Sequence, residues 1–160
     1  MSPSPPGPVL RRLLRAPAAL YDWRLGWLLG HRFLRLTHAG RRSGRHFHTM
    51  LEVLRWDGVT HEVVVMAGLG RRADWLRNVE AGGAVGVAIS RERFTPDHRI
   101  LPVDEAAAVL ADYERRNRLL APVLRRALGW LVGWPYDGSD EARRRLVAQL
   151  AVVAFEPVRT

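Results

Sequence analysis

Three segments with the pattern of β-strands follow one another early in the chain, with only turns between them. They span residues 32–38, 45–56 and 59–67. The first turn, residues 39–44, is bounded by glycine, and the second is Asp57-Gly58, a dipeptide that favours a tight hairpin. Strands joined by short turns pair antiparallel. A Rossmann domain, which alternates strands with helices from its start, is therefore excluded.

Further strands and most of the helices follow later. Residues 84–90 and 93–101 are predicted to form another antiparallel pair, and residues 150–158 a closing strand. Helices are predicted at residues 9–29 (one or two short amphipathic segments), 73–81, 103–117, 119–132 and after Ser139, a helix-capping residue. About six strands joined mainly by hairpins predict an α+β fold with a mainly β core, a six-stranded antiparallel split β-barrel with flanking helices.

Composition sets the domain count and excludes several classes of protein. The chain has 160 residues, of which 48% are hydrophobic, enough for one well-formed core. We expect a disordered Pro-rich tail at residues 1–8 and a single domain over residues 9–158. The absence of cysteine excludes disulfides and thiolate chemistry. No apolar run is long enough to span a membrane and no secretory signal is recognisable, so a cytoplasmic protein is expected.

The positive charge is concentrated near the N-terminus. The net charge is +9, and all 25 basic residues are arginine. Residues 1–51 carry nine arginines and one acid, whereas residues 52–160 carry 16 arginines and 15 acids. A local excess of this kind indicates an anionic ligand or partner. Nucleic acid is not expected, because no recognition helix or pair of stacking aromatic residues is evident.

Peripheral membrane contact is an open alternative for residues 9–30. This segment combines several arginines with Tyr21, Trp23 and Trp27, a composition suited to an anionic bilayer at the inner face of the membrane. The favoured interpretation is a helix that covers one face of the barrel.

Two loops are candidate anion sites. In Gly40-Arg41-Arg42-Ser43-Gly44-Arg45, glycine allows backbone N–H groups to turn inward, while guanidinium and hydroxyl groups add donors. Residues 68–75 form a second Gly/Arg turn that leads into a predicted helix N-terminus. If the Asp57-Gly58 hairpin forms, both loops lie at the opposite end of the sheet. The alternatives are a solvated turn for the first loop and a helix cap for the second.

Other chemistry has less support in the sequence. His46 and His48 share a strand face, and His38 and His61 are possible neighbours, but no metal-binding motif accompanies them, so no metal is expected. No Gly-x-Ser-x-Gly elbow is present. Tyr113 and Tyr136 are candidates to line a substrate pocket beside the basic loops, and Tyr136, in a Pro-Tyr-Asp-Gly turn, is expected near solvent.

These motifs together resemble the deazaflavin-dependent nitroreductase family. The resemblance rests on Leu36-Thr37-His38-Ala39-Gly40-Arg41-Arg42-Ser43-Gly44, then Thr49 and Leu51, then residues 64–70, then Asp74-Trp75-Leu76-Arg77-Asn78. It covers roughly residues 9–158 and implies a split barrel related to flavin-binding reductases. It departs from the family at Met50, where many members have proline, and at Phe47 and His48, where many have an additional arginine.

The resemblance implies an oxidoreductase that uses reduced coenzyme F420, an 8-hydroxy-5-deazaflavin with an anionic tail. Hydride would pass to a quinone, a nitroaromatic or an activated alkene, with no catalytic side chain named. The implied coenzyme-binding residues are Gly40, Arg41, Arg42, Ser43, Gly44, Arg45, His48, Thr49, Leu51, Ala67, Gly68, Leu69, Gly70, Trp75 and Asn78. The alternatives are an FMN- or heme-binding split barrel, with FMN the less expected cofactor, and a non-enzymatic basic module that binds membrane or lipid. A monomer or a homodimer is expected.

Overall fold

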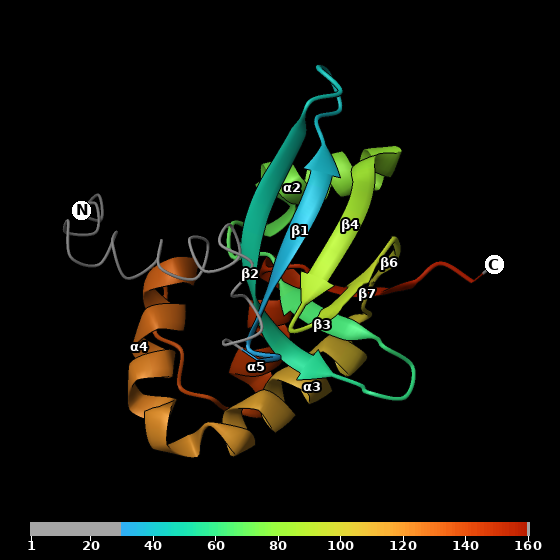
Figure 1. The fold of residues 1–160 in the computed structure, drawn as a ribbon. Coiled ribbons are helices and arrows are strands. Elements are labelled where there is room, and N and C mark those ends of the chain that lie inside the picture. Colours follow the sequence, from blue (N-terminus) through green and yellow to red (C-terminus); the bar gives the residue numbers. More distant parts are fainter. Residues whose placement is uncertain (1–29, 160) are drawn as a thin grey trace, which may run out of the picture.

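The computed structural model describes residues 30–159, which form a mainly β structure flanked by helices (Figure 1). The strands are β1 Phe33–Ala39, β2 His46–Trp56, β3 Val63–Met66, β4 Ala84–Ile89, β5 Glu92–Phe94, β6 Pro96–Ile100 and β7 Val152–Pro157. The helices are α2 Asp74–Asn78, α3 Val103–Arg116, α4 Ala121–Val132 and α5 Asp140–Gln149, with short turns at Gly70–Arg72, Val79–Gly83 and Arg118–Leu120. The expected N-terminal tail and amphipathic segment lie outside the described residues.

The seven strands form one antiparallel sheet that curls into a split barrel. Their order is β5-β4-β1-β2-β3-β7-β6, and every neighbouring pair is antiparallel. The edge strands β5 and β6 are consecutive in the chain and separated only by Thr95, so the two edges of the sheet lie close together. The split-barrel α+β prediction is confirmed, with seven strands in place of six.

The additional strand arises within the predicted strand 93–101. Glu92–Phe94 pairs with β4, whereas Pro96–Ile100 pairs with β7 at the other end of the sheet order. Pro96 has no N–H to donate, and the chain changes pairing partner at this residue.

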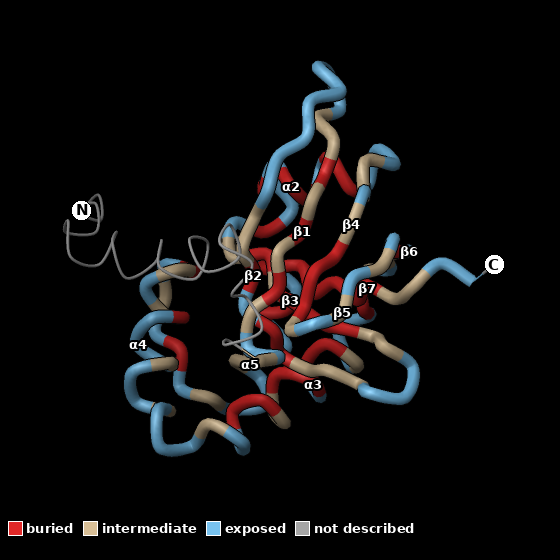
Figure 2. Tube along the Cα trace, in the orientation of Figure 1, coloured by how far each residue is buried: buried red, intermediate tan, exposed pale blue. Residues whose placement is uncertain are grey.

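Two hydrophobic cores occupy the two faces of the sheet. In β3, Val63 and Val65 belong to the core inside the barrel, while Val64 belongs to the core under the helices. In β7, Val153 and Phe155 point inward, and their neighbours pack outward. Both faces are buried at residues 63–65 and 152–155 (Figure 2), and all seven residues there are apolar. Figure 1 shows α3, α4 and α5 on one side of the barrel.

The β2–β3 hairpin differs from the predicted tight turn. Its connection runs from residue 57 to residue 62, and the Asp57 N–H donates to Glu62 O at 2.9 Å. Asp57 Oδ1 accepts from the N–H groups of Val59 and Thr60 at 2.8 and 3.1 Å. These bonds hold an Asx-type loop that is longer than a two-residue hairpin.

Candidate functional site

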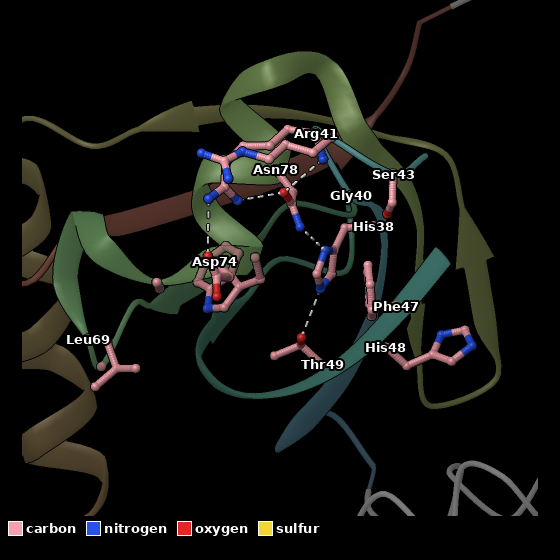
Figure 3. A pocket seen from close by; sticks show the side chains of 14 residues that line it. His38, Gly40, Arg41, Ser43, Phe47, His48, Thr49, Leu69, Asp74 and Asn78 are labelled. Carbon is pink, nitrogen blue, oxygen red and sulfur yellow. Dashed lines mark hydrogen bonds and ion pairs between the residues drawn. The ribbon is translucent and has the colours of Figure 1, made fainter. Parts of the chain in front are cut away.

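A cavity of about 620 Å³ opens between the two predicted basic loops at one end of the barrel (Figure 3). Its lining comes from the end of β1, the 40–43 loop, the start of β2, the turn after β3, and α2. The prediction that both loops lie at the same end of the sheet is confirmed.

The first loop is closed by its own backbone. The Gly40 N–H donates to Arg45 O and the Gly44 N–H to Gly40 O, both at 2.8 Å. Arg45 N–H donates to Ser43 Oγ at 3.2 Å. Within residues 30–159, the backbone N–H groups of Arg42 and Ser43 and the Arg42 guanidinium have no partner. The donors left for an anion are therefore these groups and the Ser43 hydroxyl hydrogen.

Arg41, the neighbouring arginine, is held by the protein itself. Its backbone N–H and its Nη1 both donate to Asn78 Oδ1, at 3.1 and 2.9 Å. Its Nη2 lies 3.3 Å from Asp74 Oδ1. Arg41 thus ties the loop to α2, and its charge is partly compensated by Asp74.

Asn78 continues this set of bonds to His38 and Thr49 (Figure 3). Because Asn78 Oδ1 accepts from Arg41, its Nδ2 amide donates to His38 Nδ1 at 3.0 Å. His38 must then carry its proton on Nε2, which donates to Thr49 Oγ1 at 3.0 Å. The Thr49 hydroxyl accepts this bond, and its own hydrogen has no partner in the described part of the chain. A donor is thereby left at the cavity wall.

His38 is kept neutral by its surroundings. It is 4% exposed, and burial is the main cause that lowers its pKa below the ordinary value of 6.5. The charge of nearby His48 lowers the pKa further, while Asp74 opposes the change. A neutral imidazole that accepts from Asn78 agrees with this direction.

The rest of the wall is apolar. Phe47 is 42% exposed and Leu69 is 74% exposed at the cavity, while Trp75 is largely buried. The Arg45 guanidinium lies over the ring of Phe47, 5.8 Å from its centroid. Such a wall suits a flat aromatic ring beside the polar loop.

The structure brings together ten of the predicted coenzyme-binding residues at the cavity: Gly40, Arg41, Arg42, Ser43, His48, Thr49, Gly68, Leu69, Trp75 and Asn78. Five others do not line it: Gly44, Arg45, Leu51, Ala67 and Gly70. Leu51 and Ala67 belong to the barrel core. Gly70 has a φ of +65°, and a Cβ there would come within 2.9 Å of Gln149 O, so its role is close packing.

Tyr113 and Tyr136 do not line the cavity, and the expectation that Tyr136 lies near solvent is wrong. Both are buried in the core between the sheet and the helices. The Tyr113 hydroxyl donates to Glu52, and the Tyr136 hydroxyl donates to the buried Glu114. Burial and the neighbouring carboxylate raise the pKa of each phenol.

Four lining residues are not among the predicted coenzyme-binding residues: His38, Phe47, Ala73 and Asp74, of which the last two belong to the predicted 68–75 loop. The burial of His38 could have been predicted, because it follows the buried Leu34 and Leu36 at alternate positions of β1 and so lies on the same face of the strand. A polar side chain on a buried face needs hydrogen-bond partners. No comparable signal marks Asp74, which reaches Arg41 only through the tertiary fold.

Within residues 30–159, no group of three or more His, Asp or Glu side chains is arranged to hold a metal ion. None of the helices in this range is both long and apolar enough to cross a membrane.

The fold and the site define a split-barrel protein with a polar, arginine-bearing loop at the mouth of an apolar-walled cavity. Residues 15–120 match the family described as F420H(2)-dependent quinone reductase, and the chain belongs to that family. It is thus an F420-dependent oxidoreductase, and its cofactor is coenzyme F420. No curated protein matches the chain.

Solved structures similar to this chain are distant. One is described as an F420-H2 dependent reductase (17% identity, TM-score 0.45, covering 79% of this chain and 96% of that one). Another is an FMN-binding protein related to pyridoxamine 5'-phosphate oxidase from Nostoc punctiforme (14% identity, TM-score 0.45, covering 98% and 82%). A third is described as a domain-swapped dimer (15% identity, TM-score 0.45, covering 88% and 100%).

The cavity residues have the chemical groups that the coenzyme needs. Arg42, the free N–H groups beside it and Ser43 offer donors to an anionic tail. Phe47, Leu69 and Trp75 offer an apolar wall to the ring system.

Proposed function

We propose that this protein transfers hydride from reduced coenzyme F420 to a quinone, with both bound in the cavity between the 40–45 loop and the turn at residues 67–70. The observation that carries the proposal is the division of this cavity. Uncompensated donors from Arg42 and Ser43 lie on one wall, and apolar side chains lie on another. Nitroaromatics and activated alkenes are further acceptors that such a site would take.

In this proposal the protein binds and orients, and the coenzyme supplies the hydride. Arg42 and Ser43 hold the anionic tail, and Arg41 fixes the loop through Asn78 and Asp74. The quinone receives two electrons and one hydrogen with the hydride and takes one proton from solvent, giving a hydroquinone. The outward hydrogen of Thr49 donates to an oxygen of a bound ring, and Phe47 and Leu69 limit access of water.

We further propose that residues 9–158 act as one domain, that the protein works in the cytoplasm, and that it is a monomer or a homodimer. Size-exclusion chromatography with light scattering measures the last of these.

A fluorescence titration with coenzyme F420, with FMN in parallel, tests the proposed site. We expect saturable binding of F420, and Arg42→Ala to weaken it by about 1–3 kcal/mol, or about 5- to 150-fold, as for loss of a charged hydrogen bond. Arg93→Ala is the matched control, because Arg93 is exposed on β5 and lies outside both basic loops and the cavity lining. Equal affinity in the two variants would remove the loop from the site, and tighter binding of FMN would assign a different cofactor.

A further inference from the structure

Helix α4 has apolar side chains on both its inner and its outer side. On the inner side, Leu128 and Val132 are buried in the core between the sheet and the helices. On the outer side, Val123 is 70% exposed and Trp130 is 59% exposed, and Leu119 in the preceding turn is 92% exposed. An exposed apolar surface of this kind marks an interaction site.

These outer side chains form one continuous stripe. Val123, Ala127 and Trp130 follow at intervals of four and three residues within α4, the spacing that places side chains on the same helix face, and Leu119 is exposed in the turn just before the helix. Pro122, Val123, Arg126, Ala127 and Trp130 line a single surface groove. We call Leu119, Pro122, Val123, Ala127 and Trp130 the α4 stripe. Figure 2 shows the outer side of α4 mostly exposed.

The charge around the α4 stripe has one sign. Between Glu114 and Asp137 the sequence holds five arginines and no acidic residue. Arg118 and Arg126 are exposed, and neither forms an ion pair within residues 30–159, whereas the Arg125 guanidinium lies beside Gly138, near Asp137. Apolar and aromatic side chains flanked by unpaired arginines are complementary to a surface that is apolar inside and anionic at its rim.

We propose that the α4 stripe docks on an anionic lipid bilayer. Leu119, Val123 and Trp130 would enter the boundary between headgroups and acyl chains, while Arg118 and Arg126 meet the lipid phosphates. A second copy of this chain is the poorer occupant, because its own α4 would bring the same positive charge to the contact. An anionic bilayer supplies both the apolar phase and the opposite charge.

The position of α4 connects this surface to the cavity. A Cβ on Gly68 would lie 3.7 Å from Leu131 Cδ2, so α4 packs directly against the turn that forms one cavity wall. The next residue of that turn, Leu69, is exposed at the cavity. Docking through α4 therefore brings the cavity wall close to the bilayer, where long-chain quinones dissolve. Only this last step, delivery of a lipid-dissolved quinone, rests on the proposed function.

Vesicle co-sedimentation of the full-length protein tests the docking surface without the coenzyme. We expect the protein to bind vesicles of phosphatidylglycerol and phosphatidylcholine, to bind pure phosphatidylcholine much less, and to be released by salt. The double variant Val123→Ser/Trp130→Ser is expected to lower the partition coefficient at least tenfold. Val59→Ser/Val158→Ser is the matched control, since both residues are exposed and lie away from α4. All four substitutions are at exposed positions, and circular dichroism checks that each variant is folded.

Three results would overturn the proposal: no binding to anionic vesicles, equal loss of binding in the control variant, or no loss in the α4 variant. If the α4 variant instead turned a dimer into a monomer in sedimentation equilibrium, the face would belong to a second copy. The F420 titration separates this proposal from the proposed function. The α4 variant should bind the coenzyme and reduce a water-soluble quinone as the unmodified protein does.

Discussion

Replacing Asn78 with aspartate tests the hydrogen-bond direction that leaves Thr49 as a donor at the cavity. Asp and Asn have the same shape, so the bonds from Arg41 N–H and Nη1, at 3.1 and 2.9 Å, are retained. The substitution removes only the N–H donor that faces His38 Nδ1 at 3.0 Å. A carboxylate oxygen there requires a proton on Nδ1, which the ring supplies either as the neutral Nδ1–H tautomer or as the protonated imidazolium. In both cases the carboxylate charge favours the imidazolium and raises the pKa of His38.

The size of the effect follows from the geometry. Two unit charges 3 Å apart interact by about 5 kcal/mol at an effective dielectric constant of 20, an upper bound of about 4 pKa units. Burial of His38 and the pairing of the same carboxylate with Arg41 reduce this gain. A carboxylate beside a charged partner typically shifts its pKa by about 1–3 units. We expect the pKa of His38 to rise by about that amount in Asn78→Asp.

Two-dimensional ¹H–¹⁵N NMR of the histidine rings, recorded across pH, measures both tautomer and pKa. The unmodified protein should show His38 as the neutral Nε2–H tautomer, and Asn78→Asp should show a raised pKa. Asn117→Asp is the control, because the Asn117 side chain donates to Tyr113 O at the end of α3, away from the cavity. A proton on Nδ1 in the unmodified protein, or an unchanged pKa of His38 in Asn78→Asp, would refute the assigned direction of the hydrogen bonds from Asn78 through His38 to Thr49.

Three further predictions concern packing, pH and the departure from the family pattern. Gly70→Ala should lower the free energy of unfolding, measured in urea, by about 1–3 kcal/mol, because φ is +65° and Gln149 O lies 2.9 Å from the added Cβ. Gly30→Ala is the control: φ there is +58° but the added Cβ meets open space, so the free energy of unfolding should fall less. The pKa of His38 is lower in the folded protein than in the unfolded chain, so the unfolded chain binds more protons as pH decreases. The free energy of unfolding should therefore fall as pH decreases from 6.5 toward the lowered pKa. His38→Phe should remove that part of the pH dependence in urea titrations. His48→Arg adds a permanent cation at an exposed lining position and should tighten F420 binding in the fluorescence titration by about 1 kcal/mol, whereas unchanged affinity would place the anionic tail elsewhere.

The barrel was predictable because its signals are local. Alternating patterns and short turns define β1, β2 and β4, and Ser139 begins α5, where its Oγ accepts from Ala142 N–H at 3.2 Å. The predictions that were wrong depended on distant partners. The change of strand partner at Pro96 is decided by pairing with β7, a segment about 60 residues later. Tyr136 lies in a turn-like sequence between α4 and α5, yet Glu114 of α3 gives its hydroxyl a buried partner.

The candidate site also depends on distant partners that the sequence does not reveal, because the two arginines of one motif have different surroundings in the fold. In sequence, Arg41 and Arg42 are equivalent donors in a basic loop. In the fold, Asn78 and Asp74 hold the guanidinium of Arg41, so that charge organises the loop, and only Arg42 is left with its donors uncompensated. The partner that makes this distinction, Asn78, lies 37 residues from Arg41 and also sets the tautomer of His38. Mutation of Arg41 would therefore disturb loop position, His38 and ligand affinity together, and Arg42 is the residue at which anion binding can be measured alone.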